Sequence, residues 1–168
     1  MKFVRTASLG LIGCLALFAF AQAASTDGGK GGGFKKENFN YSEWARGRFS
    51  EVVTVTNPQR FIYLAGVGSE DETAAVGGKI LHTADVYAQC KYAWDKIKRT
   101  LEKQNASLAD IVKVTTYVTD MRSMPDVGKC RAEVLGSLPQ PAGTLVGVTA
   151  LAWPGMMIEV DVTAVRGK

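Results

Sequence analysis

Two β-branched, apolar segments near the middle of the chain predict a pair of strands. Residues 51–56 are rich in Val and Thr and stop at Asn57-Pro58, a pair typical of turns. Residues 60–66 resume the apolar pattern. Because only a short loop separates the two segments, we expect them to form a hairpin.

A long amphipathic helix is predicted from the spacing of the next apolar residues. Thr83 is a candidate N-cap, the pattern continues to about Gln104, and Asn105 is a plausible left-handed terminator. Apolar residues recur at three- and four-residue steps, which is the spacing of one buried helix face. This face comprises Val86, Cys90, Ala93, Trp94, Ile97 and Leu101.

The rest of the chain predicts a strand at 111–119, a second helix opening at Ser123, and final strands at 144–148 and 157–165. The second helix has its own apolar stripe, formed by Val127, Cys130, Val134 and Leu138. The order β-β-α-β-α-β-β predicts an α+β domain in which two helices cover one face of one sheet. The other sheet face also carries apolar residues, so we expect it to form a subunit interface.

The N-terminal residues have the layout of a secretory signal peptide. A basic start is followed by an apolar run at 9–20 and by Ala21-Gln22-Ala23, which predicts cleavage after Ala23 and a periplasmic or secreted protein. A rival interpretation is a lipoprotein site at Cys14, which would attach the protein to a membrane. We therefore predict a signal peptide at 1–23, a flexible Gly/Lys-rich tail at 24–38 and one domain at 39–168.

Charge and composition exclude several classes of function. The chain has 20 basic and 16 acidic residues among 168, and removing Lys2 and Arg5 with the signal peptide leaves a net charge of +2. The charges are scattered, so a nucleic-acid surface is not predicted, and cleavage leaves no membrane anchor. His82 is the only histidine, which argues against a metal site and against a Ser/His/Asp triad.

Cys90 and Cys130 remain after signal cleavage, and an oxidising compartment permits a disulfide between them. The sequence alone favours the other interpretation, two small buried residues on the apolar stripes of separate helices, because a pairing cannot be deduced from sequence.

Several segments together resemble the RidA/YjgF family. These are residues 106–120, Leu64-Ala65-Gly66, residues 141–148 and Ile158-Glu159-Val160-Asp161. The resemblance extends over about residues 41–165. It implies a chorismate-mutase-like fold and a homotrimer with small-molecule clefts between subunits. Family enzymes hydrolyse an imine or enamine to a keto acid and ammonia without a cofactor.

The resemblance also implies roles for individual residues. Glu159 matches the glutamate that activates water, whereas Gly143 stands where family enzymes have a carboxylate-binding arginine. Arg122 is a candidate source of the missing positive charge, although a solvated arginine at a helix start is its more ordinary interpretation. The other expected ligand-binding positions are Phe49, Ala65, Gly66, Thr144 and Leu145; Phe49, Ala65 and Leu145 replace polar family residues.

Three functions follow as hypotheses. The first is a divergent exported protein that binds a small, less acidic metabolite and hydrolyses it with Glu159. The second is a non-catalytic trimeric binding or interaction module, and the third is a 2-iminobutanoate/2-iminopropanoate deaminase. If the cleft is otherwise intact, we expect an arginine at position 143 to raise imine hydrolysis.

Overall fold

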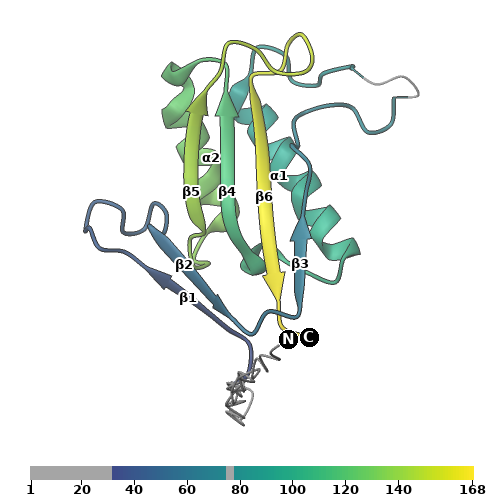
Figure 1. Ribbon diagram of the computed structural model, residues 1–168. Coiled ribbons are helices and arrows are strands. Elements are labelled where there is room, and N and C mark those ends of the chain that lie inside the picture. Colours follow the sequence, from purple (N-terminus) through teal and green to yellow (C-terminus); the bar gives the residue numbers. More distant parts are fainter. Residues whose placement is uncertain (1–31, 75–77) are drawn as a thin grey trace, which may run out of the picture. The chain divides into compact units, whose positions relative to one another are not determined.

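The computed structural model describes residues 32–74 and 78–168, which belong to one compact unit of the chain. The expected signal peptide, its cleavage site and Cys14 lie outside these residues. The elements, labelled in Figure 1, are β1 (Lys35–Phe39), β2 (Val52–Thr56), β3 (Arg60–Tyr63), α1 (Val86–Lys103), η1 (Leu108–Asp110), β4 (Ile111–Val118), η2 (Met121–Ser123), α2 (Met124–Leu135), β5 (Ala142–Gly147) and β6 (Ile158–Arg166).

Four strands form a mixed sheet in the order β3-β6-β4-β5. Strands β4 and β5 are parallel, and the other two pairs are antiparallel. Helices α1 and α2 lie together on one face of this sheet (Figure 1). The predicted α+β class, with two helices packed on a sheet, is confirmed.

The core lies between these two helices and the sheet. All six residues of the predicted α1 stripe are buried, as the helical spacing indicated. On the sheet, β4 Val114 faces the core beside β6 Val162, and β4 Val118 does so beside β6 Ile158. Among residues 32–74 and 78–168, no helix is both long and apolar enough to cross a membrane.

The start of α1 differs from the prediction by two residues. Asp85, rather than Thr83, is the N-cap, and its side chain accepts a hydrogen bond of 2.9 Å from the backbone N–H of Ala88. The preceding Ala84 has a φ of 66°, so the chain turns sharply before the helix begins. At the other end Asn105 has a φ of 51°, which confirms the predicted left-handed terminator.

Asp85→Ala is expected to lower the free energy of unfolding by about 1 kcal/mol, because the Ala88 N–H loses its capping acceptor. Urea unfolding of the purified protein measures this difference. Glu102→Ala, at an exposed position of the same helix, is the control and is expected to change stability far less. Equal effects of the two substitutions would contradict a capping role for Asp85.

A disulfide joins the two helices. Cys90 of α1 and Cys130 of α2 are fully buried and bonded, with an S–S distance of 2.02 Å. The interpretation favoured from sequence, two unpaired small residues, is therefore wrong. Each cysteine was correctly placed on an apolar stripe, but only the packing of α1 against α2 brings the two positions together.

The N-terminal strands also differ from the prediction. Strand β2 pairs with β1 and not with β3, while β3 pairs with β6, so the expected hairpin of residues 51–56 with 60–66 is wrong. The expectation of a flexible tail is likewise wrong for Lys35 to Asn38, which lie in β1. Their polar sequence does not have the apolar pattern from which a strand is predicted. The strand is held instead by its pairing with β2 and by the Lys36 ammonium, which donates to the carbonyl oxygens of Ala109 and Ile111.

The segment before β2 is attached to the edge of the main sheet. The backbone N–H of Ser50 donates to Pro141 O at 3.1 Å, and its hydroxyl donates to Gln140 O at 2.6 Å. These bonds place the turn at residues 44–49 beside the start of β5. That turn forms one wall of the pocket described below.

Candidate functional site

The strand register divides the expected site residues between the two faces of the sheet. Gly143 lies opposite the buried Val114, so it belongs to the helix-covered face. Glu159 lies opposite Tyr117, one position out of phase with the buried β6 residues, and therefore belongs to the open face. Within one chain, the glutamate and residue 143 thus face opposite sides of the sheet.

A pocket of about 580 Å³ lies between the 44–49 turn, α2 and β5, and we call it the α2–β5 pocket. It contains four residues that the sequence singled out: Phe49, Gly143, Thr144 and Leu145. Its other lining residues are Trp44, Gly47, Arg48, Thr116, Met124, Val127, Gly128, Arg131, Ala132 and Gln140. The lining is mainly apolar, with two guanidinium groups and no carboxylate among the described residues.

Arg131 of α2 places its guanidinium in this pocket, directly beside Gly143. A Cβ at position 143 would come within 2.8 Å of Nη1 of Arg131 and 3.3 Å of Phe49 Cβ. The absence of a side chain at residue 143 therefore makes room for the Arg131 guanidinium.

The Arg131 guanidinium has few partners among the residues that the structure describes. Nη2 donates a long hydrogen bond of 3.4 Å to Pro141 O, and the buried Nε has no hydrogen-bond partner. Burial lowers the pKa of Arg131 from its ordinary value, because the charged form loses hydration.

Sequence reasoning missed Arg131, although a signal was present. Arg131 follows Val127 by four residues and precedes Val134 by three, so it lies on the apolar stripe of α2. A charged residue at such a position is a reason to look for a buried polar site.

The mouth of the α2–β5 pocket is aromatic. The rings of Trp44 and Phe49 meet edge to face, with centroids 5.5 Å apart, and the Arg48 guanidinium lies over the Trp44 ring at 5.4 Å. Trp44 is well exposed, so a large apolar surface borders the opening. Such a rim suits a ligand, or a neighbouring subunit, with apolar groups.

Glu159 occupies a second position, on the open face of the sheet. Its carboxyl group lies against Gly66, where an added Cβ would be only 2.6 Å from Cδ of Glu159. Val67 and Val160 exchange two backbone hydrogen bonds of 2.9 Å, which hold the Gly66 segment beside β6. A side chain at residue 66 would therefore displace the carboxyl group of Glu159 from this position.

The surroundings of Glu159 favour its protonated form. Partial burial raises the pKa of Glu159, and the negative charges of Glu70 and Asp161 raise it further. Glu70 itself is paired with Lys96 at 2.9 Å. A raised pKa brings a carboxyl group closer to the pH range in which a general acid or base is most effective.

Comparisons with known proteins agree with this architecture. Residues 42–166 match the family model described as Endoribonuclease L-PSP. A RutC family protein of Pyrococcus abyssi is 32% identical over 121 residues, which is 71% of this chain and 87% of that protein. The chain belongs to the RidA/YjgF family. The resemblance noted in the sequence is thereby confirmed.

Solved structures of related proteins support the same assignment. The Rid family protein YyfB of Yersinia pestis superposes with a TM-score of 0.67 at 25% identity, covering 78% of this chain and 98% of that one. A putative endoribonuclease of Thermotoga maritima gives a TM-score of 0.57 at 27% identity, covering 74% and 91%.

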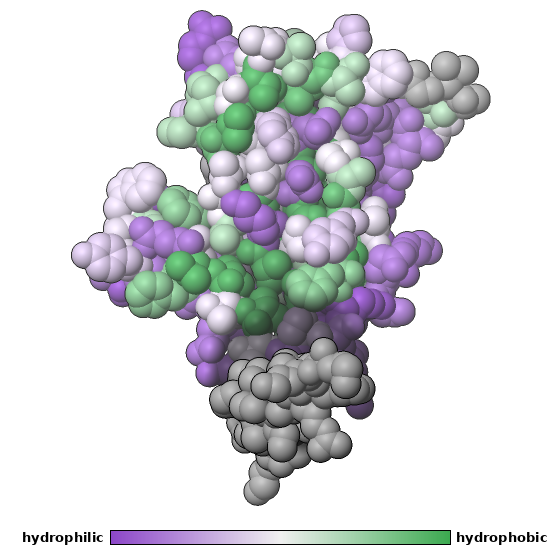
Figure 2. Space-filling view, viewed as in Figure 1, coloured by the Kyte–Doolittle hydropathy of each residue, from purple (hydrophilic) through white to green (hydrophobic). Residues whose placement is uncertain are grey.

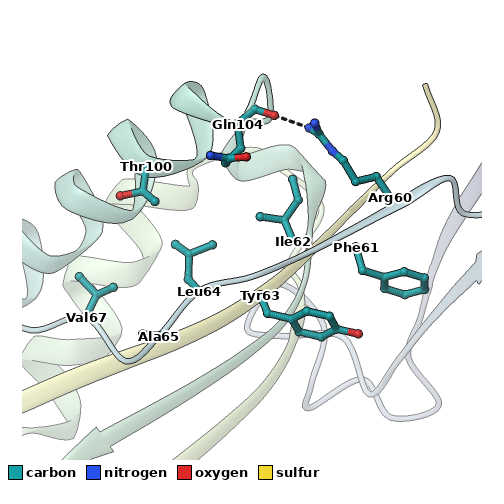
Figure 3. Close-up of a pocket in the computed structure, with 9 residues that line it drawn as sticks. All are labelled: Arg60, Phe61, Ile62, Tyr63, Leu64, Ala65, Val67, Thr100 and Gln104. Atoms are coloured by element: carbon teal, nitrogen blue, oxygen red, sulfur yellow. Dashed lines mark hydrogen bonds between the residues drawn. The ribbon is translucent and has the colours of Figure 1, made fainter.

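The remaining expected positions of this RidA/YjgF chain lie elsewhere. Ala65 borders a separate hollow of about 510 Å³ between β3 and α1, where Ile62 and Leu64 point toward the helix and Phe61 and Tyr63 point away (Figure 3). The Arg122 side chain is 91% exposed and pairs with Asp120 at 2.6 Å. Arg122 is not among the described residues that line either hollow.

The position of Arg131 also changes what an arginine at residue 143 would do. The sequence-based expectation treated position 143 as an open place in the RidA/YjgF cleft. Because the Arg131 guanidinium already lies there, the single substitution Gly143→Arg would drive two like charges and two long side chains into one space. The expected gain in hydrolysis therefore does not follow for the single variant.

Proposed function

We propose that this RidA/YjgF-family protein is a homotrimer that binds a small metabolite in clefts between subunits and hydrolyses an imine or enamine with Glu159. The observation that carries the proposal is the Glu159 carboxyl group, which lies against Gly66 on an open sheet face and has a raised pKa. A hydrolase of this kind needs a positioned group that takes a proton from water.

The open sheet face supports a site shared between subunits. Phe61 and Tyr63 stack on each other there, 52% and 74% exposed, and Figure 2 shows further apolar surface on this face between polar groups. A second copy of the chain packed on this face would bury these side chains. In the trimer that we propose, a neighbour's α2–β5 pocket lies on the Glu159 side, because residue 143 and Glu159 of one chain face opposite sides of the sheet.

The proposed chemistry is a hydrolysis that needs no cofactor. The Glu159 carboxylate takes a proton from water as the water oxygen bonds to the C=N carbon. The proton then passes from Glu159 to the nitrogen, which gives a carbinolamine. Transfer of the remaining hydroxyl proton to the nitrogen accompanies breakage of the C–N bond, so that a carbonyl compound and ammonia are released and Glu159 is again a carboxylate. An enamine first takes up a proton at carbon and loses one from nitrogen, and it then follows the same steps as an imine.

We also propose that the protein is exported. The disulfide between Cys90 and Cys130 supports this, because such bonds persist in oxidising compartments and are rare in reducing ones. The signal-peptide layout of residues 1–23 points in the same direction.

A non-catalytic binding module is the second candidate. Phe49 and Leu145 are apolar and line the α2–β5 pocket, and Ala65 has no polar side-chain group. A cleft that has lost polar groups favours binding over chemistry, whereas the environment of Glu159 favours hydrolysis.

The test uses two variants, each with a substitution in a different part of the proposed cleft. Glu159→Gln removes the proton acceptor, and Gly143→Trp fills the α2–β5 pocket. Each variant, and the wild-type protein, is given 2-iminobutanoate generated in situ, and keto acid and ammonia are followed. The two variants are then co-expressed with different tags, and mixed oligomers are purified through both tags.

If each cleft uses Glu159 of one copy and the α2–β5 pocket of the next, one of the three clefts in a mixed trimer is intact. We therefore expect mixed trimers to recover about one third of the wild-type rate, while each variant alone is inactive. An active wild type without recovery would place the site within one chain. An inactive wild type would favour the binding module, and a monomer by light scattering would overturn the shared cleft.

A further inference from the structure

We propose that Arg131 makes the α2–β5 pocket a carboxylate-binding site, which takes a small carboxylate whose remaining part is apolar. The inference rests on the proposed function in one respect, that the metabolite enters this pocket. It adds the residue of this chain that holds the ligand's carboxylate, Arg131 of α2 in place of a side chain at residue 143.

The first reason is the unbalanced charge of Arg131. The guanidinium is largely buried, yet the described residues offer it one long hydrogen bond, to Pro141 O, and no carboxylate. A buried cation without a partner is costly, and an anion bound beside it removes much of that cost. Arg48 at the rim adds a second positive charge to the same pocket.

The second reason is the set of donors that remains free. The Nη1 and Nη2 groups of Arg131 both face the space beside Gly143, and among the described residues Nη2 makes only the 3.4 Å hydrogen bond to Pro141 O. A guanidinium is planar and presents its N–H groups in pairs, which match the two oxygens of a carboxylate. The ligand class that best fits an open guanidinium edge is therefore a planar carboxylate.

The third reason is the character of the other walls. Apolar side chains line the same pocket: Phe49 comes from the 44–49 turn, Leu145 from β5, and Met124 and Val127 from α2. The pocket volume of about 580 Å³ is in the range of small-molecule sites. A short apolar chain attached to the carboxylate fits these walls, whereas a highly hydrated polyanion does not.

Gly143 also contributes to the proposed carboxylate-binding site. Any side chain at this position would meet the Arg131 guanidinium, since even a Cβ would be 2.8 Å from Nη1. Gly143 therefore acts as a positioning residue, and its effect on binding passes through Arg131.

The inference is tested by isothermal titration calorimetry on the full oligomeric protein at fixed ionic strength. Butanoate and 2-oxobutanoate are the carboxylate probes, and butanamide is the neutral probe of similar shape. None of the three carries a C=N bond, so their binding does not depend on whether the protein hydrolyses imines. The variants are Arg131→Gln and Arg131→Lys, with Arg46→Gln as a control that removes an exposed arginine from the 44–49 turn, outside the pocket lining.

We expect the wild type and Arg46→Gln to bind both carboxylates and to bind butanamide much more weakly. Arg131→Gln is expected to weaken carboxylate binding by about 10- to 100-fold, and Arg131→Lys to fall between the two, because an ammonium keeps the charge and loses the planar donor pair. Equal binding of carboxylates to the wild type and to Arg131→Gln would overturn the inference. Binding of chloride or phosphate as tight as that of butanoate would also overturn it.

A second pair of variants separates binding from folding. Gly143→Val is expected to weaken carboxylate binding by displacing Arg131, and the double variant Arg131→Ala/Gly143→Arg to restore part of it by supplying a guanidinium from β5. In the ligand-free protein, Arg131→Gln is expected to keep or raise the Tm, because it removes an unpaired buried charge. A lower Tm together with unchanged carboxylate affinity would show that Arg131 has only a structural role.

The two proposals fail in different ways. Arg131-dependent carboxylate binding without imine hydrolysis would leave the inference standing and remove the catalytic proposal. If the wild type hydrolyses the imine and Arg131→Gln leaves the KM unchanged, the catalytic proposal stands and the inference about Arg131 is wrong.

Discussion

Glu159→Gln is expected to lower the rate of imine hydrolysis by about 100- to 1,000-fold, the range typical of losing a general acid or base. Glutamine keeps the shape of the side chain beside Gly66 but cannot take a proton from water. The measurement is kcat for keto-acid release, with the thermal stability of each variant checked in parallel. A variant that is as fast as the wild type would remove Glu159 from the mechanism.

The same residue predicts a pH dependence. Burial, Glu70 and Asp161 raise the pKa of Glu159 above its ordinary value of 4.5. Activity that needs the carboxylate should therefore rise with pH at a higher pH than it would for a glutamate of ordinary pKa. Asp161→Asn removes one neighbouring negative charge and is expected to move this rise to lower pH. The Asp161→Asn substitution leaves the ion pair between Lys96 and Glu70 unchanged, so the shift in the pH profile reports the loss of the Asp161 charge.

The raised pKa also has a consequence for stability. Between pH 4.5 and the higher pKa of the folded state, the native protein holds the Glu159 proton more firmly than the unfolded chain does. The free energy of unfolding therefore falls as pH rises through this window. Urea unfolding of Glu159→Gln is expected to lack this fall, and an identical pH profile in both proteins would contradict the environment described for Glu159.

Removing the disulfide is expected to lower the free energy of unfolding by about 4 kcal/mol. Cys90 and Cys130 are 40 residues apart, and cross-linking a loop of that length restricts the unfolded chain by about this amount in the chain-entropy account. The double variant Cys90→Ala/Cys130→Ala, unfolded in urea without reductant, measures the loss. Both sulfur atoms are in the core, so a small packing loss adds to the entropic effect.

Two controls isolate the bond itself. Reductant should destabilise the wild type by a similar amount and leave the double alanine variant unchanged. In the full-length chain, denatured without reductant, thiol titration should leave two of the three cysteines, Cys90 and Cys130, unreactive. Three titratable thiols, or a double variant as stable as the wild type, would contradict the pairing.

Much of the fold followed from local patterns. The α1 stripe was predictable because helical spacing by itself says which side chains share a face, and all six of its residues are buried. Asn105 was predictable for a similar reason, since asparagine tolerates the left-handed conformation that ends a helix. The family, too, followed from short segments such as residues 106–120.

Two predictions that were wrong, the strand pairing and the unpaired cysteines, concerned contacts between distant parts of the chain. The β-branched residues of 51–56 indicated a strand but not its partner, which is the polar β1 and not β3. The apolar stripes carrying Cys90 and Cys130 were visible, but their meeting depends on how α1 and α2 pack together. A local pattern predicts which face of a helix or strand is buried, but it does not predict which other element packs against that face.

The candidate site shows the same division. The sequence by itself determined that Glu159 is present and that residue 143 has no side chain. Only the tertiary structure decided that these two positions face opposite sides of the sheet, and that Arg131 of α2 fills the space beside Gly143. The reason is physical: the identity of a residue is a property of the chain, whereas the position of a guanidinium depends on the helix that carries it and the strand it packs against.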